Sequence, residues 1–500
     1  MRIYDFLRNS ARNYPDRIAV VCREQRLTYR RLDWLSDLVA EGLIAKGVKK
    51  GDRVGLFLDN SCEYISAYFG ILKAGAVVVG LNSQYVAREL EVLLNDCSPK
   101  IIITDSKHSA AAGEALKSCC YPAQLWIMDN ALTAEDDVIQ RAGLLESDPC
   151  ADDDLAVIIY TSGTTGKPKG VMLSHSNISA NADSIIEYLQ LTPQDRIMVI
   201  LPFYYSYGMS LLTTHIKVGA AMVIDNRFLY PNTVLENMIK EEVTGFAGVP
   251  SHYNILIKKS ALREFKLPKL RYVTQAGGAM APAMIKEFKI ILPEVEFYVM
   301  YGQTEAAARL SYLDPAYLPE KIGSIGNAIP GVELEVLDEH NHLVVNPGEI
   351  GEIVARGKNI MRGYWNAPEE TARVLREQWL FTGDLARKDK DGFIYIVSRK
   401  KEMIKSGANR ISPLEIEDIV CQMAEVVECA AVGVPDEILG EAIRLYVVLN
   451  GVKVTEREIM IYCKNNLAGY KQPKEIRFVS GLPKTSTGKI CRLSLAETKR

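Results

Sequence analysis

Hydrophobic residues recur with two alternating periodicities along the first 150 residues of the chain. Residues 31–47 (RLDWLSDLVAEGLIAKG) carry apolar side chains at helical spacing and end on a glycine, which predicts a helix. Residues 52–59 predict a strand, 63–75 a second helix and 76–82 a second strand. This alternation is typical of βαβ units, in which helices cover a mainly parallel sheet. We therefore predict an α/β fold.

A different pattern begins near Ile350. Short apolar runs separated by turn residues (EIVARG, WLFTGD and FIYIVS) predict a small β-rich subregion. Ser412 and Pro413 then form a helix-start signal, a capping residue followed by a first-turn proline. We expect the chain to divide just before this signal, at a basic run. The sequence predicts a large domain of βαβ-type sheets over 1–398, a hinge over 399–402 and a small mobile α+β domain over 403–500.

Composition excludes several classes of protein. The 500 residues include 59 Lys and Arg against 62 Asp and Glu, so the chain has no basic excess for binding nucleic acid. The 10 cysteines form no CxxC or zinc-spaced set, and we expect reduced thiols. Residues 1–17 lack the apolar segment of a signal peptide, and the most apolar stretch, 64–81, is interrupted by glycines and Lys73. We therefore expect a cytoplasmic protein without an integral membrane segment.

One predicted strand leads into a loop whose residues suit an anion. Residues 155–160 (LAVIIY) predict a buried strand, and a polar, glycine-rich segment follows. Its glycines let the backbone approach an anion closely, while its hydroxyls and lysines add donors and charge. The residues concerned are Thr161, Ser162, Gly163, Thr164, Thr165, Gly166, Lys167 and Lys169. A flexible surface turn is the alternative for this segment taken alone.

The spacing of this loop differs from that of the G-x-x-x-x-G-K-[ST] phosphate loop, and Pro168 directly follows Lys167. The spacing therefore argues against a simple phosphate-loop NTPase.

Further motifs follow the loop in a fixed order. They are LPFYYSYG (201–208), AGGAM (276–280), YGQTEA (301–306), FTGD (381–384), SRKKEMIKSG (398–407) and PKTSTGKI (483–490). With this ordered set the whole chain resembles the adenylate-forming enzymes, which include acyl- and aryl-CoA synthetases, adenylation domains of peptide synthetases and firefly-type luciferases. The resemblance implies ATP-dependent activation of a carboxylate, which attacks the α-phosphate while pyrophosphate leaves.

The resemblance also implies which residues handle the phosphates. The glycine-rich loop would hold the departing phosphates, Glu305 would bind Mg²⁺, and Thr304 would offer its hydroxyl to a phosphate oxygen. Lys489 would reach the carboxylate and the α-phosphate and offset the charge that develops during attack. By composition alone Lys489 would be a solvated lysine, so its role depends on the surrounding motif.

The adenosine site is implied in the same way. Tyr301 would supply a flat face for adenine, and Asp384 would accept both ribose hydroxyls with help from Arg399. The ordinary alternative for Asp384 is a turn aspartate that accepts backbone amides. Backbone against which a base or an acyl chain can lie is implied at Gly277, Gly278, Ala279 and Gly302.

Lys401 corresponds to the hinge residue of the family. Relatives use the small domain twice: one orientation delivers the lysine equivalent to Lys489 for adenylation, and a second admits a thiol for thioester formation. An ordinary linker lysine would be compatible with the same position.

The acyl pocket is expected at Tyr205, Ser206, Ser210, Gly277, Gly302, Ala306 and Ala307. Tyr205 is either a core aromatic residue or a gate near the carboxylate. Amino-acid-activating relatives usually place an aspartate where this chain has Ser206, and a hydroxyl cannot neutralise a buried ammonium. We therefore expect an acid without an α-amino group, either a fatty acid or an aryl acid. His175 and His252 are expected to be structural.

The sequence thus predicts an AMP-forming acid–thiol ligase. The acceptor is CoA, or alternatively the phosphopantetheine of a separate carrier protein. The competing interpretation is a catalytically silent nucleotide- or acyl-binding protein, which would require a broken motif. Lys167, Glu305, Asp384 and Lys489 are all present.

Overall fold

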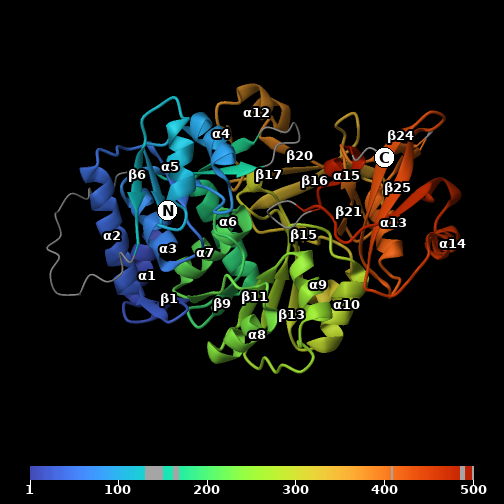
Figure 1. The fold of residues 1–500 in the computed structure, drawn as a ribbon, viewed down its shortest axis with the longest axis horizontal. Coiled ribbons are helices and arrows are strands. Elements are labelled where there is room, and N and C mark those ends of the chain that lie inside the picture. Colours follow the sequence, from blue (N-terminus) through green and yellow to red (C-terminus); the bar gives the residue numbers. More distant parts are fainter. Residues whose placement is uncertain (130–149, 162–167, 407–408, 485–489, 498–500) are drawn as a thin grey trace.

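The structure is a computed structural model that describes residues 1–129, 150–161, 168–406, 409–484 and 490–497. Its strands form four sheets, and helices cover both faces of the two largest (Figure 1). The smallest unit, formed by the C-terminal residues, lies at the opposite end of the molecule from the N-terminal helices. The predicted α/β fold with a smaller α+β C-terminal unit is confirmed.

The first large sheet has seven strands in the order β18-β8-β7-β4-β3-β5-β6. They are β3 (Arg53–Phe57), β4 (Val77–Gly80), β5 (Ile101–Thr104), β6 (Gln124–Ile127), β7 (Leu155–Thr161), β8 (Lys169–Ser174) and β18 (Gly363–Tyr364). Strands β3 to β7 run parallel, as the alternating pattern predicts. Helices α2 (Tyr29–Ala45), α3 (Cys62–Lys73), α4 (Ala87–Cys97) and α5 (Ser109–Lys117) also belong to this half.

The second large sheet has nine strands in the order β15-β14-β13-β12-β11-β9-β10-β1-β2. They are β1 (Ile18–Cys22), β2 (Gln25–Thr28), β9 (Arg196–Val199), β10 (Ala221–Ile224), β11 (Gly245–Gly248), β12 (Tyr272–Gln275), β13 (Glu296–Tyr301), β14 (Ser311–Leu313) and β15 (Asn327–Ala328). Helices α8 (Pro231–Lys240), α9 (Pro250–Lys259) and α10 (Pro282–Ile291) cover its outer face. The N-terminal hairpin β1–β2 therefore joins strands that follow it by about 200 residues, with Val20 paired to Met222.

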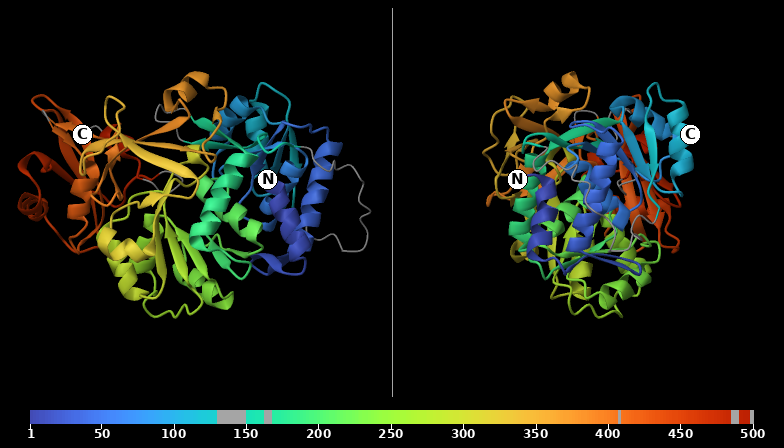
Figure 2. Two further views of the ribbon diagram at one scale, coloured as in Figure 1. Left: turned by 180° about the vertical axis from the view of Figure 1, so that it is seen from behind. Right: turned by 90° about the vertical axis from the view of Figure 1, so that its left-hand side faces the viewer.

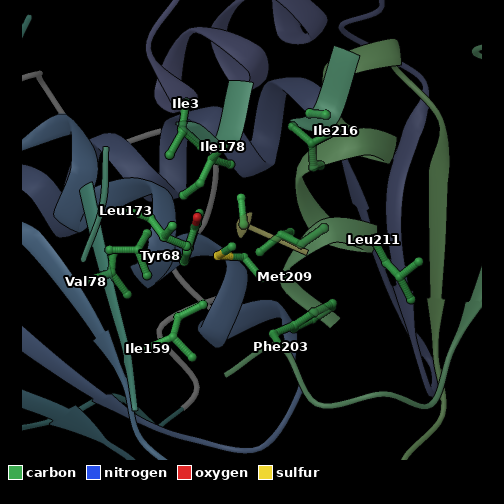
Figure 3. Packing of buried hydrophobic residues seen from close by; sticks show 14 of the residues in the cluster. Ile3, Tyr68, Val78, Ile159, Leu173, Ile178, Phe203, Met209, Leu211 and Ile216 are labelled. Carbon is green, nitrogen blue, oxygen red and sulfur yellow. The ribbon is translucent and has the colours of Figure 1, made fainter. Parts of the chain in front are cut away.

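Helices α1 (Ile3–Asn13), α6 (His175–Leu189) and α7 (Ser206–Val218) pack with α2 and α3 between the two sheets. Their apolar side chains meet those of the strands in one continuous core (Figure 3). Because side chains alternate along a strand, Val78 of β4 faces this core while Val77 and Val79 face α4 and α5. A Cβ at Gly70 would lie 2.6 Å from Cβ of Val39, so glycine permits the close approach of α2 and α3.

The predicted β-rich subregion is a five-stranded sheet beside the two large ones (Figure 2). It contains β16 (Val332–Leu337), β17 (Ile350–Gly357), β19 (Leu375–Arg376), β20 (Trp379–Lys388) and β21 (Ile394–Arg399). The short helix α12 (Pro368–Val374) lies in the same part of the chain, whereas α11 (Leu318–Lys321) precedes it and packs Leu318 in the core beside the second large sheet.

The C-terminal unit has its own five-stranded sheet and its own core. It contains β22 (Ile404–Ser406), β23 (Asn409–Ile411), β24 (Val426–Asp436), β25 (Gly440–Leu449) and β26 (Glu475–Phe478), with α13 (Pro413–Val420), α14 (Glu456–Asn466) and α15 (Arg492–Glu497). Ser412 caps α13, since its hydroxyl accepts the Glu415 N–H at 3.4 Å, which confirms the helix start predicted there.

Two further expectations concern the chain as a whole. All ten cysteines are free thiols in the structure, as expected. In the part of the chain that the structure describes, no helix combines the length and the apolar character needed to span a bilayer.

His175, the first residue of α6, is buried against the N-terminal helix. Its Nδ1 accepts a hydrogen bond from the Ile3 backbone N–H at 3.2 Å, and Tyr4 packs edge-on against its ring. Burial lowers the pKa of His175 to about 4, below its ordinary value of 6.5. Between these values the unfolded chain binds a proton that the folded protein does not. The stability therefore falls as the pH falls from 6.5 toward 4.

We expect His175→Asn to weaken this acid sensitivity, because the Asn carboxamide oxygen accepts the Ile3 N–H without titrating. The slope of the unfolding free energy against pH should decrease by up to one proton, about 1.4 kcal/mol per pH unit. Urea midpoints measured across this pH range test the effect. His342→Asn is the matched control, since the His342 side chain is 78% exposed. An unchanged slope in His175→Asn would contradict the assignment.

Candidate active site

The glycine-rich loop connects two antiparallel strands of the first large sheet. Thr161 ends β7 and pairs with Lys169, the first residue of β8. The Thr161 hydroxyl donates to the Lys169 carbonyl at 3.5 Å. The predicted phosphate-binding residues Ser162, Gly163, Thr164, Thr165, Gly166 and Lys167 lie outside the described residues. The structure therefore describes the two ends of the loop.

Lys169 is held by residues that the sequence analysis did not single out. Its ammonium forms an ion pair with the Glu370 carboxylate on α12 and lies 5.1 Å from the centroid of the Tyr364 ring. The hydrogen bond with Lys169 lowers the pKa of Glu370. Tyr364 reaches this position because β18 pairs with β8, so that Tyr364 lies opposite Val171.

The same tyrosine orients the predicted metal ligand. The Tyr364 hydroxyl donates to Oε1 of Glu305 at 2.8 Å, and the Met361 backbone N–H donates to the Glu305 carbonyl at 2.8 Å. Glu305 lies in the 3₁₀ turn η2 (Thr304–Ala306), just after β13. Burial raises the pKa of Tyr364, and the neighbouring Glu305 charge raises it further, so the phenol remains protonated and donates.

Asp384 joins the second large sheet to the β-rich subregion. Its Oδ2 accepts the Tyr301 hydroxyl at 2.7 Å, and its Oδ1 lies 3.1 Å from Nε of Arg399. Tyr301 ends β13, whereas Asp384 and Arg399 are paired residues of β20 and β21. The Asp384 charge raises the pKa of Arg399, and burial raises that of Tyr301. This cluster brings together the three residues predicted to bind adenosine.

The predicted backbone platform follows β12. Gly277 has φ +87°, a conformation that side chains rarely adopt. Gly278 and Ala279 are exposed, and the Gly278 carbonyl accepts a hydrogen bond from Nε2 of Gln275 at 2.6 Å. Gly302 is required for a different reason, because a Cβ there would lie 2.1 Å from the Ala308 carbonyl oxygen.

The predicted acyl residues fall into two groups. Tyr205 and Ser206 are half-buried at the start of α7, where Ser206 Oγ lies 3.3 Å from Oγ1 of Thr304. Ser210, one turn further along α7, is buried and donates its hydroxyl to the Tyr207 carbonyl at 2.7 Å. Ala306 and Ala307 are fully buried after Thr304. The structure thus brings Ser206 beside the predicted phosphate-binding turn and uses the Ser210 hydroxyl within its own helix.

The remaining predicted residues lie at the C-terminal unit. Lys401 stands between β21, which ends at Arg399, and β22, which begins at Ile404. Lys489 lies outside the described residues, although two residues of its motif are placed: Lys484 and Ile490 form an isolated antiparallel bridge. The interval 399–402 therefore coincides with the passage from one sheet to the next.

Tyr364 and Glu370 illustrate what sequence reasoning missed. Their partners Glu305 and Lys169 are 59 and 201 residues distant along the chain. Neither residue lies in a motif that the sequence analysis singled out, and the contacts that give them a role join distant parts of the chain.

Comparison with known proteins assigns the chain to a family. Residues 7–365 match the family described as AMP-binding enzyme, and residues 415–489 match the AMP-binding enzyme C-terminal domain. The chain is 33% identical to a long-chain-fatty-acid–CoA ligase of Bacillus subtilis (strain 168), over 99% of this chain and 94% of that protein. It is 36% identical to a feruloyl-CoA synthase of an Amycolatopsis species, over 96% of both proteins.

A solved structure has the same architecture. The anthranilate CoA ligase AuaEII, in complex with anthranoyl-AMP, superposes with a TM-score of 0.91 at 26% identity, over 99% of this chain and 96% of that one. The chain therefore belongs to the AMP-binding enzyme family of adenylate-forming proteins. Within that family it is an acid–thiol ligase of the AMP-forming acyl-CoA synthetase type.

We expect Tyr364→Phe to weaken the response to Mg²⁺, because it removes the hydrogen bond to Glu305 and retains the ring beside Lys169. Loss of a group that orients a metal ligand typically costs about 10- to 100-fold in metal affinity or activity. The Mg²⁺ concentration for half-maximal adenylation should rise accordingly. Tyr317→Phe, at a 49% exposed position, serves as control. An unchanged Mg²⁺ dependence in Tyr364→Phe would show that this bond does not position a metal ligand.

Proposed function

We propose that this enzyme activates a carboxylic acid without an α-amino group, either a fatty acid or an aryl acid, and transfers the acyl group to CoA. The observation that carries the proposal is the continuity of the segment 301–307. At its start the Tyr301 hydroxyl donates to Asp384, and Thr304 in its middle contacts Ser206. One short segment therefore joins the proposed adenosine site to the proposed acyl site.

Two half-reactions follow from this arrangement. A carboxylate oxygen of the acid attacks the α-phosphorus of ATP, and the bond to the β-phosphate breaks to release pyrophosphate. The thiol sulfur then attacks the acyl carbonyl, AMP leaves, and the thiol proton passes to solvent. We assign Asp384 and Arg399 to the ribose, Tyr301 to adenine, and Thr161, Lys169 and the loop between them to the phosphates.

Mg²⁺ would neutralise phosphate charge when it is bound. Glu305 fits such an ion, because Mg²⁺ commonly uses one or two carboxylates together with phosphate oxygens and water. Among the residues that the structure describes, no cluster of three or more His, Cys, Asp or Glu side chains could hold a metal. This observation agrees with a site that the nucleotide itself completes.

The acid class follows from the side chains at the start of α7. Ser206 offers a hydroxyl, and its neighbours Tyr205 and Tyr207 are aromatic, so no carboxylate is present there to balance a substrate ammonium. The relatives named above act on fatty, feruloyl and anthranilate acyl groups. Family membership alone therefore leaves the acid open.

Pyrophosphate exchange across fatty, benzoic-type and α-amino acids tests this proposal. We expect exchange with acids that lack an α-amino group, and formation of the acyl-CoA when CoA is added. The assignment of the pocket would be overturned if an α-amino acid gave the strongest exchange and the Ser206→Ala variant left that exchange unchanged. Failure of every acid to promote exchange would overturn the proposed function.

We further expect Lys489→Ala to slow adenylation selectively. A contact to charge that develops during attack typically contributes about 10²- to 10³-fold in rate. Thioester formation from preformed acyl adenylate should largely survive, because that step needs no stabilisation of the pentavalent phosphate. Lys484→Ala is the matched control within the same motif, since Lys484 pairs with Glu428 at 2.7 Å. Equal losses in both half-reactions would argue against the role of Lys489.

A further inference from the structure

Arg309 is a buried cation that the functions assigned above do not use. Arg309 comes shortly after the segment 301–307 in the sequence, and the residue is only 3% exposed. The Arg309 carbonyl accepts hydrogen bonds from Nδ2 of Asn181 at 3.1 Å and from Nδ2 of Asn359 at 2.9 Å. Both amides are buried, so the backbone that carries the guanidinium is held in one place.

The guanidinium has only neutral partners. Its Nε donates to Sδ of Met300 at 3.3 Å, and its Nη1 donates to the Ala308 carbonyl at 3.1 Å. Its central carbon lies 4.0 Å from the centroid of the Tyr207 ring. Its side chain also has hydrogen-bond contacts with the phenols of Tyr188 and Tyr207. Within the described part of the chain, no carboxylate forms an ion pair with Arg309.

The nearest phenols do not supply the missing charge. Burial raises the pKa of both Tyr188 and Tyr207, so the two rings remain neutral. The Tyr207 hydroxyl is occupied by Thr274, to whose carbonyl it donates at 2.9 Å, and the Tyr188 hydroxyl donates to Sδ of Met300 at 3.0 Å. A buried charge is costly unless an opposite charge pairs with it. Arg309 therefore has the properties of a site that an anion completes.

The position of Arg309 connects it to the acyl pocket. The place that a Gly302 side chain would take is filled by the Arg309 backbone, whose Cα lies 2.7 Å from an added Cβ. Tyr207, which stacks on the guanidinium, lies on α7 between Ser206 and Ser210. The cation is thus fixed between the two elements that carry the proposed acyl-binding residues.

We propose that Arg309 pairs with a second anionic group of the substrate, so that the preferred acid is a dicarboxylic acid. This inference rests on the proposed function, because it concerns the far end of the acid that is activated. The reacting carboxylate meets ATP near Thr304, and the second carboxylate meets the guanidinium. A guanidinium suits a carboxylate, because its N–H groups donate charge-assisted hydrogen bonds and its charge neutralises the anion.

Pyrophosphate exchange with matched acids tests the inference. Each pair shares a skeleton and differs in the far group: butyrate and succinate, hexanoate and adipate, decanoate and sebacate, and p-toluate and terephthalate. We expect the wild-type enzyme to favour the diacid of the best-fitting pair by about 100-fold in kcat/KM, the range seen when one partner of a buried charge pair is lost. Arg309→Met should abolish this preference, and Arg309→Lys should retain part of it.

Arg356→Met is the matched control. Arg356 also stacks on an aromatic ring, with its guanidinium carbon 4.7 Å from the centroid of Trp379, but its side chain pairs with Glu333 of β16 in the β-rich subregion. The diacid preference should survive this change. Thermal stabilisation of the wild-type and Arg309→Lys proteins by adipate or hexanoate gives a second readout that does not depend on turnover.

The outcomes separate the two proposals. Equal or stronger exchange with the monocarboxylic acids in the wild-type enzyme would overturn the inference and leave the proposed function intact. An unchanged diacid preference in Arg309→Met would likewise overturn the role of Arg309. Should Arg309→Met fail to fold, the wild-type ratios and the Arg309→Lys variant decide the question. No exchange with any acid would instead overturn the proposed function.

Discussion

The close approach at Gly302 is the constraint on which the site depends. Because a side chain there would collide with the Ala308 carbonyl, only glycine lets the chain double back after β13. In the doubled segment Thr304 contacts Ser206 of α7, and Glu305 accepts a hydrogen bond from Tyr364 of β18. Arg309 follows them and stacks on Tyr207 of α7. The nine residues 301–309 therefore contribute to both proposed sites, together with Asp384 and Arg399 at one end and with α7 at the other.

Charge compensation distinguishes the two ends of this segment. Asp384 is buried, and both of its oxygens already meet a donor, Tyr301 on one side and Arg399 on the other. A carboxylate oxygen has two lone pairs, so both oxygens can still accept further hydrogen bonds, as the proposed ribose contact requires. Arg309 has the opposite arrangement, a fixed cation among neutral groups. The charge of Asp384 is therefore balanced by Arg399, whereas no carboxylate among the described residues pairs with Arg309.

Tyr364 couples parts of the chain that no single motif contains. Its ring contacts Lys169 at one end of the glycine-rich loop, and its hydroxyl contacts Glu305. The pairing of β18 with β8 is what brings it there. The proposed acyl residues Ser206 and Ser210 lie on α7, which is separate from the β8–β18 pairing that holds Tyr364. The differing acids named for its relatives agree with this separation.

Local pattern determined much of this protein from the sequence alone. Periodicity predicted α2, α3, β3 and β4, and the capping pair at Ser412 predicted the start of α13, because these features depend on neighbouring residues. The order of the motifs likewise predicted the family. Only the tertiary structure decided that β1 joins the far sheet, that Tyr364 orients Glu305 and that Arg309 has no carboxylate partner among the described residues. Such contacts join residues far apart in the chain. They depend on how whole sheets pack, and a single sequence carries no local signal for that.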